Sequence, residues 1–163
     1  MKIYIGSDHA GFELKKILIT TLEERGYEVF DKGAYEYNAD DDYPDFIVPV
    51  AQGVSNDPEE VKGIVLGGSG QGEAMVANRF PHVRAAVFNG QYEPKDGRDV
   101  PHEIVISREH NDANVLSLGA RFLNEQEATD AMLLWLQTPF VGDERHIRRI
   151  AKIDAITQRI FND

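Results

Sequence analysis

Cysteine is absent from this chain of 163 residues, which excludes disulfides, thiolate metal ligands and a thiol nucleophile or base. The chain also lacks any apolar run near the roughly 18 residues that a membrane-spanning helix requires. Basic residues are scarce, because 17 Lys and Arg stand against 28 Asp and Glu and leave a net charge of −11. This balance disfavours nucleic acids and anionic membranes as partners.

The apolar segment at the start of the chain, Ile3–Ile5, is too short for a signal peptide and predicts a first strand. Together with the missing cysteines, it favours the cytoplasm. The length and a hydrophobic content of 42% are those of one globular domain, residues 1–163, with a sizeable core.

Short apolar segments alternate along the chain with segments of helical periodicity. Strands are predicted near residues 2–5, 27–30, 63–66, 83–88 and 114–118. Helices are predicted near residues 10–25, 44–54, 73–79, 103–109, 125–137 and 143–160. Such alternation indicates βαβ units, and hence an α/β fold whose five-stranded parallel sheet is covered by helices on both faces.

The most informative stretch runs from Leu66 to Glu73, where four glycines and one serine follow an apolar strand. Glycines at a strand-to-helix turn let backbone N–H groups converge on an oxyanion or phosphate. A carboxylate beside such donors, here Glu73, can take a proton from a carbon next to a carbonyl. The alternative is a tight turn that needs glycine for its shape, with Glu73 favoured only by the helix dipole.

Other polar residues follow predicted strands directly, namely Asp8 and His9 after the first and Arg121 after the fifth. Ligands of parallel sheets bind beyond the carboxyl ends of the strands, so we expect these residues at one site with the glycine loop. His9 can change charge near neutral pH, and with Asp8 it could orient and protonate a bound hydroxyl. The alternative for Asp8 is a cap on the helix that begins near Ala10.

Arginines gather near the C-terminus, where Arg145 and Arg149 share one face of a predicted helix. Two guanidiniums on one face suit a phosphate, whereas the alternative is a solvated face paired with neighbouring acids. The segment Ser107–Asp112 is dense in hydrogen-bonding groups but by itself indicates only a helix end. The five histidines show no metal-ligand spacing, and the glycine loop has neither the spacing of a dinucleotide fingerprint nor a Walker lysine.

Several motifs, taken in order, resemble those of the type B ribose-5-phosphate isomerase family, which includes galactose-6-phosphate isomerase. They are Gly6–Gly11, Gly67–Glu73, Ala77–Arg79, Arg84–Ala86, Ser107–Leu116, Gly119–Arg121 and Arg145–Ile150. The resemblance implies a Rossmann-like three-layer α-β-α sandwich that forms a homodimer, or a dimer of dimers, with sites built from both subunits. It implies that a helix near residues 143–160 packs on the partner. It also implies aldose–ketose interconversion of a sugar phosphate through a cis-enediolate, without metal or cofactor.

The resemblance also suggests a role for each residue at the site. Many members carry a cysteine base at the position of Gly67, whereas this chain resembles the subgroup with glutamate at the position of Glu73. Glu73 would move the proton between C1 and C2, and Asp8 would assist proton transfer at the substrate oxygens. His110 would open the sugar ring, with Asn111 beside it. The enediolate oxygen would be held by Ser69, Gly68, Gly70 and Gly72, and the phosphate by His9, Arg121, Arg145 and Arg149.

One segment departs from the family pattern, because Asn89–Pro101 is longer than the usual link and looks like an insertion near the sugar. Such loops read sugar length, so this segment bears on the identity of the sugar more than on the chemistry. The resemblance makes ribose 5-phosphate the first choice of substrate, followed by a tetrose 4-phosphate or a hexose 6-phosphate. A non-catalytic sugar-phosphate-binding protein is the alternative from another class, and Glu73 and Ser69 argue against it. A nucleotide-binding oxidoreductase is the weakest interpretation.

Overall fold

The computed structural model describes residues 1–162 of the chain, and the side chains of residues 1–156. In this part the strands are β1 (Lys2–Ser7), β2 (Glu28–Asp31), β3 (Val61–Gly67), β4 (Ala85–Phe88) and β5 (Val115–Gly119). The helices are α1 (Phe12–Glu24), α2 (Pro44–Asn56), α3 (Gln71–Ala77), α4 (Glu103–Glu109), α5 (Glu125–Gln137) and α6 (Glu144–Asn162). Every predicted strand and helix is therefore present, with shifts of a few residues at the ends.

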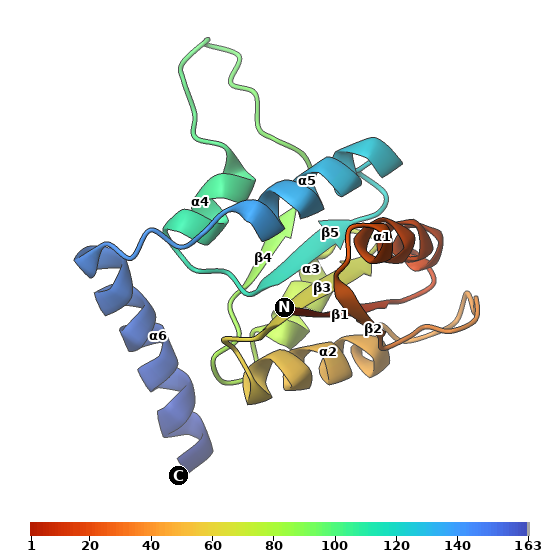
Figure 1. The fold of residues 1–163 in the computed structure, drawn as a ribbon, viewed down its shortest axis with the longest axis horizontal. Helices are drawn as coiled ribbons and strands as arrows, with labels where there is room; N and C mark the ends of the chain where they lie inside the picture. Colours follow the sequence, from red (N-terminus) through yellow and green to blue (C-terminus); the bar gives the residue numbers. More distant parts are fainter. Residues whose placement is uncertain (163) are drawn as a thin grey trace.

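The strands form one parallel sheet in the order β2-β1-β3-β5-β4 (Figure 1). Helices α1, α4 and α5 contribute to the hydrophobic cluster on one face, and α2 and α3 to the cluster on the other. This arrangement confirms the predicted Rossmann-like three-layer α/β fold. The chain reverses its direction across the sheet between β1 and β3, which is where ligands bind in such folds.

Burial explains why the central strands form continuous apolar runs. Six of the seven residues of β3 and all five of β5 are buried, because helices cover the sheet on both sides. The first cluster is built around Ile64, Leu116 and Trp135, and the second around Val50 and Val65. The two clusters hold the carboxyl ends of β1, β3 and β5 side by side, so the loops that follow these strands start from a rigid base.

The first residues of α1 and β4 differ from the predicted ones, and the hydrogen bonds at these places show why. The helix expected from Ala10 begins at Phe12, since the Asp8 carboxylate accepts hydrogen bonds from the N–H groups of Ala10 and Gly11 and holds them in a turn. The strand expected from residue 83 begins at Ala85, since the N–H of Arg84 donates to the side chain of Asn114 at 2.8 Å. At α1 the side chain binds N–H groups that a helix start leaves without an intrahelical partner, whereas at β4 it takes an N–H that the sheet could have used.

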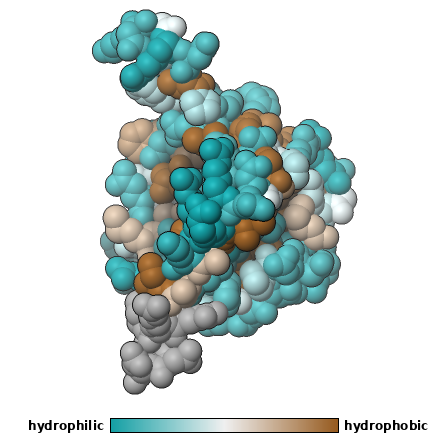
Figure 2. Space-filling view, turned by 90° about the vertical axis from the view of Figure 1, so that its left-hand side faces the viewer, coloured by the Kyte–Doolittle hydropathy of each residue, from teal (hydrophilic) through white to brown (hydrophobic). Residues whose placement is uncertain are grey.

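Two segments stand away from the layers. Helix α6 extends from the body of the molecule, and the chain between β4 and α4 makes a long projecting loop (Figure 1). Figure 2 looks onto the side of the molecule on the left of Figure 1, where brown hydrophobic patches lie among hydrophilic residues. Within the described residues, no helix combines the length and apolar character needed to cross a membrane.

Candidate functional site

A cavity of about 390 Å³ opens at the carboxyl edge of the sheet, between the loops that follow β1, β3 and β5. It lies at the point where the chain direction reverses, so its position agrees with the general rule for this fold. Its lining includes most of the residues predicted from the first, third and fifth strands. They are Asp8, His9, Ala10, Tyr43, Gly68, Ser69, Gly72, Glu73, Arg121 and Phe122.

The glycine loop turns the chain from β3 into α3 within a few residues. Gly70 precedes the helix with φ of +71°, a left-handed conformation that glycine adopts without strain. The Ser69 hydroxyl accepts a hydrogen bond from the N–H of Gln71 at 3.3 Å, and Gly72 packs against the Tyr43 ring, where a Cβ would be 2.8 Å from it. Glycine therefore serves the shape of the turn, as the structural alternative required, and leaves Ser69 and two glycines at the cavity wall.

Glu73 is the buried carboxylate of this cavity, with 4% of its surface exposed. No ion pair holds it among the residues that the structure describes, although buried carboxylates usually have a partner. Burial raises the pKa of Glu73, the charge of Asp8 raises it further, and its own backbone N–H opposes the shift. A carboxyl group with a raised pKa is a better proton acceptor than an ordinary glutamate and is therefore suited to accept and return a proton.

Asp8 lies both in a turn and at the cavity wall, the two places that the sequence left as alternatives. Its carboxylate accepts hydrogen bonds from the N–H groups of Ala10 at 2.9 Å and Gly11 at 3.3 Å, so it shapes the turn before α1. The same residue lines the cavity and contributes to the raised pKa of Glu73. Its role in the turn and its place in the cavity are therefore compatible.

His9 is held by Asp41, a residue of the loop between β2 and α2. One oxygen of Asp41 accepts from the His9 backbone N–H at 3.1 Å and lies 2.6 Å from Nδ1 of its ring. This hydrogen bond raises the pKa of His9 and is the largest cause of the shift. With Asp8, these two residues could place three ligand atoms within 4.8 Å of one another, but His9 and Asp41 already bond each other.

Arg121 lies just after β5 and places a positively charged guanidinium at the cavity. Its guanidinium packs over Gly68, where an added Cβ would lie 3.1 Å from Cζ. The side chain is exposed, and no ion pair engages it within the described part of the chain. An exposed guanidinium beside a glycine loop is available for an anionic group.

The remaining predicted residues lie elsewhere. His110 ends α4, and its ring stacks on the buried His146 with centroids 4.5 Å apart and planes within 10°. Burial lowers the pKa of His146, and the neighbouring Arg145 lowers it further.

Arg145 is 60% exposed and lies 3.8 Å from Asp143, a contact too exposed to neutralise it. Asn111 follows His110, and Arg149 lies one helical turn after Arg145 and is exposed.

This second cluster lies at the amino-terminal ends of the parallel strands, whereas Glu73 lies at their carboxyl ends. Residues 109–114 precede β5, whereas the glycine loop and Arg121 lie at its carboxyl end. Five residues of β5 span about 16 Å at roughly 3.3 Å each, so one chain does not bring His110 to Glu73. The structure thus gathers Asp8, His9, Ser69, Glu73 and Arg121 in one cavity and leaves the other predicted residues outside it.

Sequence reasoning missed four residues that the structure places at these two sites, namely Asp41, Tyr43, Asn89 and His146. Asp41 and Tyr43 lie just before the proline that opens α2, and a short polar segment at such a point was a usable signal. Asn89 directly follows a strand, which is the same signal that identified Asp8. Nothing local distinguishes His146 from the other histidines.

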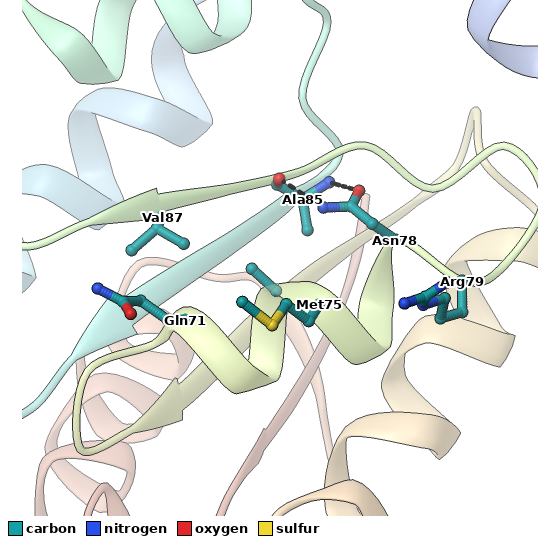
Figure 3. A pocket seen from close by; sticks show the side chains of 7 residues that line it. Gln71, Met75, Asn78, Arg79, Ala85 and Val87 are labelled. Carbon is teal, nitrogen blue, oxygen red and sulfur yellow. Dashed lines mark hydrogen bonds between the residues drawn. The ribbon is translucent and has the colours of Figure 1, made fainter.

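A second cavity, of about 470 Å³, lies between α3 and the free edge of β4 (Figure 3). The amide of Asn78 donates to the carbonyl of Ala85 at 3.0 Å and accepts from its N–H at 2.7 Å, so it covers part of the strand edge. Met75, 65% exposed, and Val87 also line this cavity. It offers apolar surface but no acid, base or nucleophile suited to catalysis.

The fold and the first cavity define an α/β protein in which a buried carboxylate and a glycine-rich loop share the carboxyl edge of a parallel sheet. The family model described as Ribose/Galactose Isomerase matches residues 3–153 of the chain. The protein therefore belongs to the ribose/galactose isomerase family and is an isomerase.

Individual relatives agree with this assignment. The ribose-5-phosphate isomerase B of Mycolicibacterium paratuberculosis is 41% identical over 150 residues, which are 92% of this chain and 87% of the relative. The structure of ribose-5-phosphate isomerase B from Clostridium thermocellum has a TM-score of 0.86 at 41% identity and covers 98% of this chain and 99% of its own. The enzyme from Mycoplasma genitalium, solved with bound ribulose-5-phosphate, has a TM-score of 0.86 at 35% identity and covers 96% of each chain.

Proposed function

We propose that this isomerase interconverts ribose 5-phosphate and ribulose 5-phosphate through a cis-enediolate, with Glu73 as the base. The observation that carries the proposal is a carboxylate only 4% exposed, without an ion-pair partner among the described residues, in the cavity that the glycine loop lines. The names of the relatives and the bound ribulose-5-phosphate in one of them support the choice of substrate.

The chemistry follows from the groups in the cavity. In an aldose–ketose conversion, a base removes the proton from C2 and returns it to C1 while the neighbouring oxygen carries negative charge. Glu73, whose pKa is raised by burial, matches the first task. Ser69 and the N–H groups of the glycine loop match the second, since fixed donors stabilise a developing oxyanion. Asp8 is close enough to Glu73 to raise its pKa, and we assign it proton transfer at the substrate oxygens.

The phosphate would bind where cations converge. His9 and Arg121 line the cavity, and the raised pKa of His9 favours its charged form. Arg145 and Arg149 are the two further cations that we assign to the phosphate, with His110 as the ring-opening group and Asn111 beside it. These last four residues belong to the opposite edge of the sheet, so they can join the cavity only from another subunit.

A homodimer with shared sites is therefore part of the proposal. Exposed apolar side chains lie on α6, namely Ile147, Ile153 and Ile156. Met75 and Val87 are exposed beside the second cavity (Figure 3). Apolar surface of this kind on a projecting amphipathic helix favours packing against a second subunit. A dimer of dimers stays an alternative for the complete assembly.

A panel of aldose phosphates tests the substrate. We expect the highest kcat/KM for ribose 5-phosphate among four-, five- and six-carbon sugar phosphates, and very low turnover of unphosphorylated ribose. A tetrose 4-phosphate or a hexose 6-phosphate with a higher kcat/KM would replace ribose 5-phosphate in the proposal. Binding of the sugar phosphates without turnover of any of them would instead support the non-catalytic binding protein.

A further inference from the structure

Four successive carbonyl groups of the glycine loop, from Gly67 to Gly70, are held from the side of β5. They accept hydrogen bonds from β5 itself and from the residues that follow β4 and β5. The donors are, in order, the Ala120 N–H at 2.8 Å, the Arg121 N–H at 3.1 Å, the Asn89 amide at 3.0 Å and the Ser117 hydroxyl at 2.6 Å. A trans peptide points its N–H opposite to its carbonyl, so the N–H groups of this loop face away from β5.

Asn89 is the donor on which the Ser69 carbonyl depends. Among the groups that the structure describes, no other donates to this carbonyl, whereas the Gly70 carbonyl also accepts from the Ala74 N–H at 3.1 Å. The side chain of Asn89 fits because residue 119 is glycine, since a Cβ there would overlap with the Asn89 amide oxygen. That oxygen is buried and has no hydrogen-bond partner, so the amide is held by this fit and by its bond to Ser69.

The peptide between Ser69 and Gly70 needs such a restraint. Gly70 has φ of +71°, and because glycine adopts positive and negative φ about equally well, sterics alone do not fix the orientation of this peptide. Reversing the peptide would turn the Ser69 carbonyl toward the β1 side of the loop, where Asp8 and His9 line the cavity. A carbonyl dipole at that place would repel a developing oxyanion instead of stabilising it.

We propose that Asn89 is a positioning residue for the isomerase reaction, and that its bond to the Ser69 carbonyl keeps the Gly70 N–H turned toward the reacting oxygen. The inference rests on the proposed function, because it assumes that the glycine loop stabilises the enediolate. It gives the first residue of the long loop between β4 and α4 a task at the site, although the rest of that loop projects away from the body (Figure 1).

The test compares Asn89→Leu, which keeps a side chain of similar shape without the donor, with Asn89→Ala. We expect kcat to fall roughly tenfold to hundredfold in both, as for a misaligned oxyanion donor. KM and the affinity for inorganic phosphate should stay within about threefold, because the ground-state contacts are unchanged. The affinity for a hydroxamate that mimics the planar enediolate should fall by the same factor as kcat.

Gln91→Ala is the matched control in the same loop. Gln91 accepts from the Glu103 N–H at 2.9 Å and donates to the Pro101 carbonyl at 3.3 Å, so it holds the far end of the loop without contact to Ser69. Its kcat should stay near the native value. If Gln91→Ala loses as much kcat as Asn89→Leu, loop movement explains the loss and the inference is overturned.

Two further outcomes separate this inference from the proposed function. If a folded Asn89→Leu or Asn89→Ala variant keeps the kcat of the native protein, the role of Asn89 is overturned and the proposed function is unaffected. Absence of turnover by the native protein on every sugar phosphate overturns the proposed function, and the inference with it. Melting temperatures measured in parallel identify a variant that has lost its fold, and the remaining Asn89 variant then decides.

Discussion

At the residue scale, Glu73 shows how burial can prepare a carboxyl group for proton transfer. A glutamate that begins a helix on the surface would keep its ordinary pKa and would be ionised at neutral pH. Here β3 and the loop after β1 exclude water from the side chain, so the charged form is disfavoured and the pKa rises. The group that is costly for folding is the one best suited to exchange a proton.

Glu73→Gln should therefore separate activity from stability. The rate should fall roughly 10²- to 10⁴-fold with little change in KM, because the amide cannot accept the proton. Because the folded protein binds the Glu73 proton more tightly than the unfolded chain, this residue costs stability as pH rises through its raised pKa. Scanning calorimetry should therefore show that Glu73→Gln raises the melting temperature more at pH 8 than at pH 4. Exposed Glu24→Gln is the control, and native turnover by Glu73→Gln would exclude the base.

The pH profile of kcat/KM should report the same group. The base must be ionised to act, so activity should fall on the acid side as pH drops through the raised pKa of Glu73. Asp8→Asn removes a charge that raises this pKa, and its acid limb should therefore lie at lower pH, whatever the loss in absolute rate. An acid limb that does not move would contradict the coupling between the two carboxyl groups.

At the scale of elements, the Glu73 carboxylate at the start of α3 occupies the space beside residue 67 at the end of β3. A Cβ at Gly67 would overlap with the carboxylate of Glu73. The resemblance described above places an alternative cysteine base at this same position, and the overlap gives a steric reason why a chain would carry a base at 67 or at 73 but not both. The glycine is thus part of the arrangement that buries Glu73.

Gly67→Ala should displace Glu73 and reduce kcat roughly 10²-fold or more, as expected when a base leaves its position. The melting temperature should fall as well, because the methyl group has no space. In a Glu73→Ala background the same substitution should cost much less stability, since the carboxylate is gone. Equal losses of melting temperature in the two backgrounds, measured by calorimetry, would show that the two positions do not compete.

The loop between β2 and α2 is another element that acts on the site from a distance. The buried Lys15 of α1 donates to Asp31 at 2.6 Å and to the Ala34 carbonyl at 2.7 Å, and so fixes the beginning of this loop. The end of the loop carries Asp41, which binds His9. A segment without regular secondary structure thus raises the pKa of a residue in the cavity.

Asp41→Asn should lower the pKa of His9, since the hydrogen bond that the Asp41 carboxylate accepts is the main reason that this pKa is raised. If charged His9 helps to bind the phosphate, KM should rise with pH, and in the variant this rise should begin at lower pH. Titration of the His9 ring by NMR measures the pKa directly. A His9 titration that is identical in both proteins would mean that the Asp41 contact is not formed in solution.

At the scale of the whole molecule, the separation of the two clusters demands an explanation. Glu73 and His110 lie at opposite edges of one sheet, about 16 Å apart along β5 at roughly 3.3 Å per residue. In a two-fold symmetric dimer, the amino ends of the strands in one subunit can lie beside the carboxyl ends of the strands in the other. The symmetry then creates two equivalent sites. Helix α6, which extends from the body, then gains a surface on which to pack.

Mixing two inactive variants tests this arrangement. After subunit exchange, Glu73→Gln with His110→Asn should recover about a quarter of the native activity, because half of the dimers are mixed and each of these has one native site. Glu73→Gln with Arg121→Ala is the control and should recover nothing, since both residues belong to the same half of the site. No recovery in the first mixture, despite proven exchange, would indicate a site within one chain.

Most of the fold could be predicted because it depends on local sequence. The apolar runs of β3 and β5, the helical periodicity of α5 and the glycines after β3 are properties of neighbouring residues, and α4 and α5 were predicted with the observed bounds. The order of the motifs was enough for the family. Strand and helix ends such as those of β4 and α1 shifted where a distant or preceding side chain took a backbone group.

The site required the tertiary structure, because its decisive contacts join residues far apart in the chain. Asp41 reaches His9 across 32 positions, Asn89 reaches Ser69 across 20, and Ser117 reaches Gly70 across 47. Such contacts arise from the packing of helices on a sheet, which no local pattern encodes. Local sequence was sufficient to place a glutamate after a glycine loop. Only the folded chain removed its water, raised its pKa, brought Asp8 and Arg121 to the same cavity and left His110 at the other end of the strands.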